Sequence, residues 1–319
     1  MDLSQDTADA FVTEPVGRTN GIDCYVEEDY YRGELDRHEA ITLVELARRV
    51  GWRRAIQALP SGNLARSMSD PTRLRFLDFL AVGKGSSILD FGASWGSLSV
   101  HMARRFPSCQ VYALDETLEG LAFLDIVKTQ EGLSNLRIAK TGVDRIPLAD
   151  ESMDIVLMIG VLEWVGEILT NTTPNLAQLA VLSEVRRTLK KGGKLVLGVE
   201  NRYSYRYLGG RPDHSHIRFG SIIPRRLASF YSSRFRRREY RTYIYSLGEY
   251  TKILKQVAYK DVQFYCAYPD HASPRVISDL GSMHEFWNNS NAPGSGLLKY
   301  LPNSALKRVV PSYLIFARK

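Results

Sequence analysis

The sequence predicts an α/β protein with a mostly parallel sheet, and two observations support that prediction. Between residues 67 and 205, short apolar segments alternate with segments whose apolar residues recur at helical spacing. Strands that are separated by helices pair in parallel through right-handed crossovers. The composition, 44% hydrophobic and 24% charged, is that of a globular protein and excludes a largely disordered, collagen-like or coiled-coil chain.

The order of the elements follows from this alternation. Ser69 and Asp70 before Pro71 mark a helix start, and that helix is expected to run to Gly83. The expected strands are 86–91, 109–115, 136–142, 153–162 and 194–201. The expected helices between them are 97–106, 118–130 and 175–190, followed by one within 245–259.

The chain of 319 residues has room for one large or two modest domains. Residues 1–29 are acidic, lack apolar periodicity and are predicted to be a flexible leader. Residues 30–66 are expected to form a helical cap, because 35–58 carries apolar residues at helical spacing. The α/β domain then occupies 67–319, with insertions at 203–245 and 271–310.

Cysteine usage and the N-terminal sequence bear on location. Cys24, Cys109 and Cys266 fit neither a disulfide framework nor a metal-ligand cluster. The chain starts without a basic segment followed by an apolar run, and it has no apolar stretch of about 20 residues. We therefore expect a cytoplasmic protein without a transmembrane segment.

Chemistry is expected at the carboxyl ends of the strands, where open parallel sheets bind ligands. The first strand ends in Asp90-Phe91-Gly92-Ala93-Ser94-Trp95-Gly96, and the second ends at Asp115. Glycines permit a sharp turn and close approach to a ligand. An acid at the next strand end can accept both hydroxyls of a ribose. Together they suit a nucleoside cofactor, although an ordinary tight turn remains an alternative.

These motifs resemble those of the class I S-adenosylmethionine-dependent methyltransferases. The resemblance rests on ILDFGASWGSLS, VYALDETLEGL, TGVDRIPLADESMDIV, GVLEWV and LSEVRRTLKKGGKLVLGVEN, in that order. It implies a Rossmann-like seven-stranded sheet with helices on both faces. It also implies a closing β-hairpin from 259–270 and 311–319, whose last strand is antiparallel and lies between the fifth and sixth strands.

The resemblance further implies S-adenosyl-L-methionine as the cofactor and a set of contacts to it. Glycines would pass under the methionine part, Asp115 would hold the ribose, and Val143 would meet the adenine. Ser94 departs from the family's usual glycine, and Gly142 stands where many members place an adenine-binding acid. The implied cofactor residues are Asp90, Gly92, Ala93, Ser94, Gly96, Asp115, Glu116, Val143, Asp144, Gly160 and Glu163. Glu163 could equally be a helix-start residue.

Methyl transfer to a hydroxyl needs an aligned nucleophile and a base of near-neutral pKa, for which histidine is the usual choice. His214 and His216 follow the fifth strand in GGRPDHSH, so they are the predicted catalytic bases, with Asp213 as an orienting partner. An exposed loop with chance histidines is the alternative. A second alternative is a metal ion bound by these three residues, although three ligands so close in sequence are weak evidence for a metal site.

The acceptor is less defined. ENRYSYRYLGGRPDHSH and YCAYPDHASPRVISD are similar to segments of bacterial methyltransferases of polysaccharide and glycoconjugate biosynthesis, which implies a sugar or other small hydroxylated acceptor. Residues 225–241, here called the arginine block, suit a phosphorylated acceptor, RNA or an anionic membrane surface, and no RNA-binding module is recognisable.

The predicted function is O-methyl transfer. The alternatives are an RNA, protein or small-molecule N-methyltransferase, or a cofactor-binding partner without activity.

Overall fold

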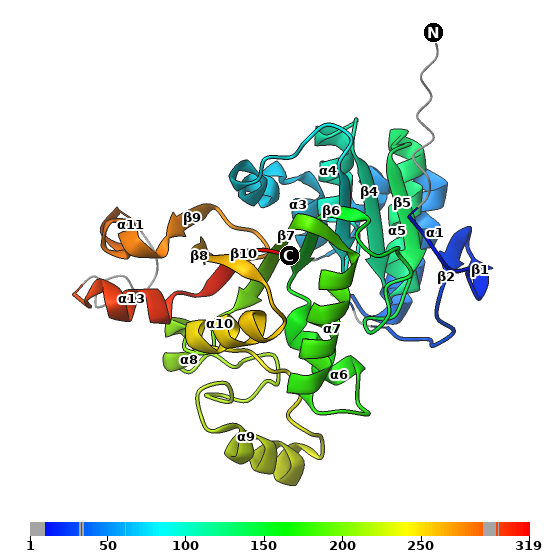
Figure 1. The fold of residues 1–319 in the computed structure, drawn as a ribbon. Helices are drawn as coiled ribbons and strands as arrows, with labels where there is room; N and C mark the ends of the chain where they lie inside the picture. Colours follow the sequence, from blue (N-terminus) through cyan, green and yellow to red (C-terminus); the bar gives the residue numbers. More distant parts are fainter. Residues whose placement is uncertain (1–9, 32, 34, 61, 290–297, 299) are drawn as a thin grey trace.

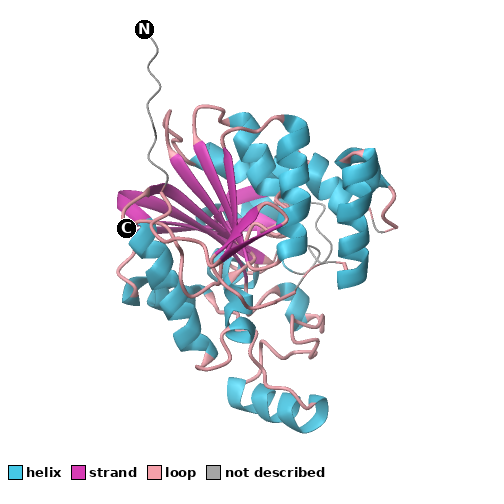
Figure 2. Ribbon diagram, turned by 90° about the vertical axis from the view of Figure 1, so that its right-hand side faces the viewer, coloured by secondary structure: helices cyan, strands magenta, loops and turns pink. Residues whose placement is uncertain are grey.

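The computed structural model describes residues 10–31, 33, 35–60, 62–289, 298 and 300–319. Its centre is one ten-stranded sheet that fans out between layers of helices (Figure 2). The strands are β1 Gly17–Thr19, β2 Ile22–Cys24, β3 Ser87–Phe91, β4 Gln110–Asp115, β5 Leu136–Lys140, β6 Met153–Ile159, β7 Leu189–Glu200, β8 Lys260–Tyr268, β9 Val276–Asp279 and β10 Ser312–Arg318. No helix among the described residues is long and apolar enough to cross a membrane.

The strand order confirms the predicted α/β class. The sheet runs β1-β2-β5-β4-β3-β6-β7-β10-β8-β9, and β5, β4, β3, β6 and β7 are parallel. The closing strand β10 is antiparallel to both neighbours, since Tyr313 pairs with Val199 of β7 and with Cys266 of β8. The seven expected strands are therefore all present. β1, β2 and β9 extend the sheet beyond the seven-stranded prediction.

Helices cover both faces of the sheet (Figure 1). The α-helices are α1 Arg37–Val50, α2 Trp52–Gln57, α3 Asn63–Ser69, α4 Ser97–Arg105, α5 Leu118–Glu131, α6 Val165–Ile168, α7 Pro174–Thr188, α8 Tyr205–Leu208, α9 Arg225–Tyr231, α10 Leu247–Gln256, α11 Met283–Asn289 and α13 Asn303–Val309. Short 3-10 helices are η1 Pro71–Phe79, η2 Leu162–Trp164 and η4 Leu280–Ser282, and η3 Ser232–Arg236 is a single π-helical turn that continues α9.

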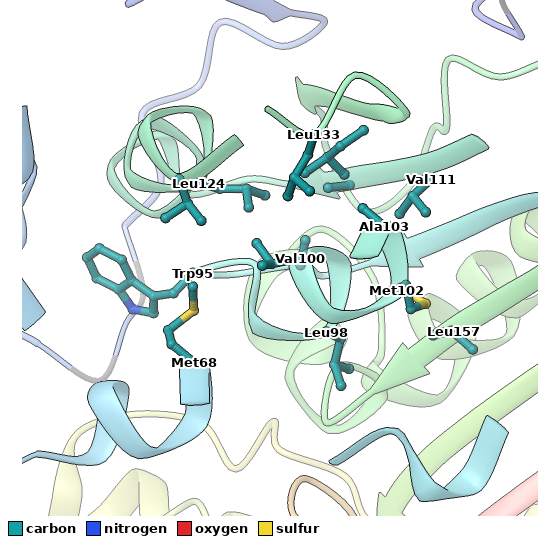
Figure 3. Close-up of a cluster of buried hydrophobic side chains, with 14 of the residues drawn as sticks. Met68, Trp95, Leu98, Val100, Met102, Ala103, Val111, Leu124, Leu133 and Leu157 are labelled. Carbon is teal, nitrogen blue, oxygen red and sulfur yellow. The ribbon is translucent and has the colours of Figure 1, made fainter. Parts of the chain in front are cut away.

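Alternate residues of each strand supply two separate cores, as the pleat of a sheet requires. Ile88 packs with α1, α4 and α5, whereas Leu89 and Phe91 pack with α7 and α10 on the opposite face. Figure 3 shows part of the first core, which includes Val100 of α4 and Leu124 of α5. Both faces are therefore buried, which is why these strands read as continuous apolar runs.

The N-terminal region differs from the predicted flexible leader where it is described. β1 and β2 form a hairpin, and β2 pairs in parallel with β5. Phe11 stacks on Tyr25 with ring centroids 5.2 Å apart, so these aromatic residues anchor the segment despite its acidic composition. Residues 1–9 of that predicted leader lie outside the described residues.

The expected helical cap at 30–66 contains α1 and α2 and the start of α3. α1 begins with a capping box in which Asp36 accepts from the Glu39 backbone and Glu39 accepts from the Asp36 backbone. The helix expected from Pro71 is instead the 3-10 helix η1, which ends at Phe79. Asp70 caps it by accepting from the Thr72 backbone N–H, as the Asp-Pro signal indicated.

Candidate cofactor and acceptor site

A cavity of about 910 Å³ lies at the carboxyl ends of the central strands, where the sequence predicted the site. The tips of β3, β4, β6 and β7 contribute to its wall, and loops after β7 and β8 close it. Its polar lining includes Asp90, Ser94, Asp115, Glu116, Thr141, Glu163, Glu200, Arg206, Arg211, His214, His271 and Arg275. Its cofactor side is the part around Gly92, Ser94 and Asp115, and its acceptor side is the part around His214 and His271.

The turn after β3 forms the cofactor side, and Asp115 holds it in place. The Ser94 backbone N–H donates to Asp115 Oδ2 at 2.8 Å, and the Thr117 backbone N–H donates to Asp115 Oδ1 at 2.7 Å. Ser94 has φ +51°, in the left-handed region that glycine adopts more easily. Its departure from the family's glycine therefore carries backbone strain, and the hydrogen bond to Asp115 stabilises the strained turn.

The glycines of this turn are required mainly by packing within the protein. A Cβ on Gly92 would lie 2.3 Å from Val161 Cγ2, and a Cβ on Gly96 would lie 2.2 Å from Leu124 Cδ1. Gly92 and Ala93 line the cavity, whereas Gly96 is not among its lining residues. Gly96 therefore has a packing role at the start of α4, and its contact with the cofactor stays a prediction.

Two buried oxygens on this side suit a nucleoside. Glu116 Oε2 is buried without a hydrogen-bond partner beside Asp115, and Thr141 Oγ1 is likewise unpartnered. Burial, followed by the charges of Asp115 and Asp144, raises the pKa of Glu116 to about 7. Burial also raises the pKa of Asp115. A ribose diol would supply the hydrogen-bond donor that Glu116 Oε2 lacks.

Four further residues predicted to bind the cofactor are Asp90, Val143, Asp144 and Gly160. Asp90 is 2% exposed, accepts from the Ser99 hydroxyl, and has a pKa raised to about 6, chiefly by burial. Val143 lines the cavity beside Thr141, whereas Asp144 is not among the lining residues. Gly160 follows β6 directly, has φ +71° and also lines the cavity. These residues fit an adenosyl group, and Thr141 is a polar residue that the sequence analysis missed.

On the acceptor side, His214 lies in the cavity and is paired with a carboxylate. Its Nε2 is 3.0 Å from Glu200 Oε2, and its ring lies 4.2 Å from that of Trp164, centroid to centroid. Burial opposes the charge on His214, but the hydrogen bond and charge of Glu200 outweigh burial and raise its pKa. The same hydrogen bond lowers the pKa of Glu200 against the effect of burial.

The other two predicted catalytic residues lie elsewhere. Asp213 does not orient His214, because its Oδ1 accepts from Ser215 and its Oδ2 accepts from Tyr240 Oη at 3.0 Å. Glu200, at the end of β7, takes the orienting position instead. His216 is exposed with φ +59° and is not among the cavity residues. Within the described residues, no three histidine, cysteine, aspartate or glutamate side chains are placed to hold a metal ion.

A second histidine–carboxylate pair lies beside the first and joins Glu163, which the sequence predicted as a cofactor residue, to His271, which the sequence analysis did not select. His271 Nε2 is 3.9 Å from Glu163 Oε1, and both side chains are more than nine-tenths buried. His271 Nδ1 and Glu163 Oε2 have no hydrogen-bond partner, and burial raises the pKa of Glu163. His271 also lies against Gly160, where a Cβ would be 3.1 Å from its Nε2.

The signal that could have revealed His271 is a repeated tripeptide. Pro212-Asp213-His214 and Pro269-Asp270-His271 have the same sequence. In each, the aspartate accepts from the backbone N–H of a following serine, Ser215 or Ser273, at 2.9 Å. Both turns therefore direct a histidine into the cavity toward a glutamate, Glu200 for His214 and Glu163 for His271.

The arginine block 225–241 does not reach this cavity. The arginines that line the cavity are Arg66, Arg73, Arg206, Arg211 and Arg275. Of these, Arg206, Arg211 and Arg275 have no ion pair among the described residues. In the block, Arg241 donates to the carbonyls of Gly166, Leu169 and Thr172. Part of the block therefore holds the fold together rather than facing the acceptor.

Comparison with known proteins agrees with this geometry. Residues 89–197 match the family model described as a methyltransferase domain. A malonyl-[acyl-carrier protein] O-methyltransferase of Xylella fastidiosa is 29% identical over 39% of this chain and 38% of its own length. A tRNA U34 carboxymethyltransferase of Desulfotalea psychrophila is 29% identical over 36% of this chain and 32% of its own. The chain thus spans about a third of the length of these curated relatives.

Solved methyltransferase structures are also similar to this chain. A SAM-dependent methyltransferase from Aquifex aeolicus matches with a TM-score of 0.43 and 17% identity, covering 66% of this chain and 88% of that one. The phosphoethanolamine N-methyltransferase 2 of Haemonchus contortus, solved with S-adenosylhomocysteine, matches with a TM-score of 0.48 and 16% identity over 86% of this chain and 59% of its own.

The strand order, the cavity and the matched segment together define the class. The chain contains a class I S-adenosylmethionine-dependent methyltransferase domain, and S-adenosyl-L-methionine is the cofactor of that domain. This confirms the family and the cofactor that the strand-end motifs predicted.

Proposed function

We propose that this protein transfers the methyl group of S-adenosylmethionine to a hydroxyl of a small, glycan or glycosylated acceptor. The observation that supports this proposal is the presence of two histidine–glutamate pairs in the same cavity as the predicted cofactor residues. An alcohol acceptor must lose a proton as the methyl group arrives, and a histidine oriented by a carboxylate is suited to accept it.

In this proposal His214 is the base. When its Nε2–H donates to Glu200, Nδ1 is left as the proton acceptor. The proton then stays on the imidazole, and Glu200 stabilises the resulting imidazolium. The cofactor supplies an already activated methyl group when bound, so the protein's own residues align the hydroxyl and hold its proton. His271 and Glu163, next to Gly160 at the end of β6, would position the acceptor oxygen.

Three cavity-lining arginines without an ion pair in the described part of the chain favour an acceptor with an anionic group. Arg206, Arg211 and Arg275 lie on the acceptor side and would bind a phosphate or carboxylate through their guanidinium groups. This assigns the anionic group of the acceptor to arginines outside the arginine block, where the sequence alone had placed it.

The test is a methyl-donor consumption assay over a panel of acceptors, with products identified by mass. The panel holds neutral sugars, nucleotide sugars, acyl-carrier-protein thioesters and transfer RNA. We expect methylated product with a phosphorylated sugar, and a loss of product when Arg206, Arg211 and Arg275 are changed to glutamine. Product only with the thioester or with RNA would contradict the hydroxylated-acceptor proposal, and donor binding without any product would contradict the activity itself.

A further inference from the structure

We propose that the segment built on α9 and η3 docks this protein onto an anionic lipid surface. The docking surface consists of Arg226, Leu227, Phe230, Tyr231, Arg234, Phe235 and Arg237. This inference goes beyond the proposed function and does not rest on it, because it concerns where the protein binds rather than which reaction it performs.

The apolar residues of this segment are unusually exposed. Leu227 is 58% exposed, Phe230 67% and Phe235 64%, and Tyr231 beside them is 45% exposed. Four large apolar or aromatic side chains within nine residues of one continuous helical segment face solvent together. Single exposed apolar residues are ordinary, but a contiguous group of this kind marks an interaction surface.

The charge of the same segment indicates the chemistry of the partner. Arg226, Arg234 and Arg237 are exposed and have no ion pair among the described residues. From 225 to 238 there is no acidic residue, and the nearby Glu239 is paired with Arg241 at 2.7 Å. Arginines beside leucine and phenylalanine match an anionic bilayer, where the cations meet headgroups and the apolar side chains enter the acyl boundary. RNA would satisfy the arginines but would leave Leu227 exposed.

The segment is also placed and anchored for docking. Figure 1 shows α9 at the margin of the molecule, away from the sheet and from the other helices. Its inner side is held to the His214 loop, because Arg236 donates to the His216 carbonyl at 2.7 Å and Arg238 donates to the Ser215 carbonyl at 3.1 Å. The exposed face is therefore presented by a segment whose other contacts fix it to the loop that carries His214.

The experiment is vesicle sedimentation of the full chain with phosphatidylcholine vesicles and with vesicles in which about a quarter of the lipid is phosphatidylglycerol. We expect binding to the anionic vesicles only, decreasing as salt is raised. The variant L227S/F230S/F235S and the variant R226E/R234E/R237E should each lose at least tenfold in partitioning. The control V12S/V16S/L176S, which changes similarly exposed residues elsewhere, should bind like the wild type.

A second measurement keeps the proposal testable if either triple variant folds poorly. The variant Phe230→Trp should shift its fluorescence emission to shorter wavelength when anionic vesicles are added, relative to the wild-type spectrum. Equal binding to neutral vesicles, unchanged binding of the serine variant, or an emission of the Phe230→Trp variant that anionic vesicles leave unchanged would overturn the proposal. Tighter binding to single-stranded RNA, with RNA displacing the protein from vesicles, would assign the surface to nucleic acid instead.

Discussion

The two sides of the cavity are built in different ways. The cofactor side comes mainly from two adjacent strand ends and the residues that follow them, Asp90–Leu98 and Leu114–Thr117, whose backbone groups and short side chains form most of the wall. The acceptor side is assembled from side chains far apart in the chain, chiefly Glu163, Glu200, His214 and His271. The first side depends on local backbone geometry, whereas the second depends on how separate loops pack over the sheet. Each side should therefore respond separately to substitution.

The largest effect is expected from breaking the acceptor side alone. His214→Gln removes the proposed base while leaving the cofactor side intact, so methyl transfer should slow by about 10²- to 10⁴-fold with the cofactor affinity unchanged. Steady-state rates and calorimetric titration of the cofactor measure the two quantities. His38→Gln, on the exposed face of α1, is the control. A rate within a few-fold of wild type would remove His214 from the reaction.

The converse substitution should break the cofactor side alone. Asp115→Ala removes the acceptor of the Ser94 and Thr117 backbone hydrogen bonds, so the turn loses its support. We expect cofactor affinity to fall more than tenfold in calorimetry, which is at least about 1.4 kcal/mol. Asp125→Ala, on α5 outside the cavity, should leave the affinity unchanged. Equal affinities of the Asp115 variant and the wild type would refute the cofactor assignment.

A smaller effect is expected from a change in the packing of α5 against the turn at Ser94. Gly120→Ala would place a Cβ 2.8 Å from the Ser94 carbonyl oxygen, although alanine normally favours a helix. We expect it to lower the free energy of unfolding by about 1–3 kcal/mol. Gly248→Ala in α10 has open space at its Cβ and should instead raise that free energy by up to about 1 kcal/mol. Chemical denaturation measures both, and a stabilising Gly120→Ala would show that the turn can move away from α5.

The smallest effect concerns the pH dependence of the His214–Glu200 pair. Glu200 has a lowered pKa, so its contribution to stability is present above its unfolded value of 4.5 and is lost as the pH falls below it. His214 has a raised pKa, so its contribution is complete below its unfolded value of 6.5 and is lost as the pH rises through the higher folded value. The unfolding free-energy difference between wild type and His214→Gln should therefore be greatest between pH 4.5 and 6.5. A difference that keeps growing above neutral pH would contradict the ion pair.

The cofactor side was predictable because its signals are local. Asp90, Gly92, Ser94 and Asp115 lie in two strand ends whose pairing follows from the parallel order, and the turn between strand and helix is specified by neighbouring residues. The role of the glycines was less predictable. Whether a Cβ at Gly96 would meet a ligand or Leu124 depends on how closely α5 approaches the turn, which no local pattern reports.

The acceptor side was predicted only in part for the same reason. His214 was found from its position after the fifth strand, but Asp213 was selected as its partner because it is adjacent in sequence. In the folded chain, Asp213 is committed to Ser215 and Tyr240, and Glu200 lies across the loop. His271 comes from the loop after β8, and only the insertion of β10 between β7 and β8 sets that loop over the cavity.

The sequence by itself determined the α/β class, the order of its strands, the cofactor of the family and the strand ends that line the cavity, because hydrophobic periodicity and turn chemistry act over short distances along the chain. The tertiary structure alone decided which carboxylate meets which histidine, which arginines face the cavity, and which remain on the exposed segment of α9. These pairings depend on distances between residues that are far apart along the chain, such as Glu163 and His271, and only the packed sheet and its loops fix such distances.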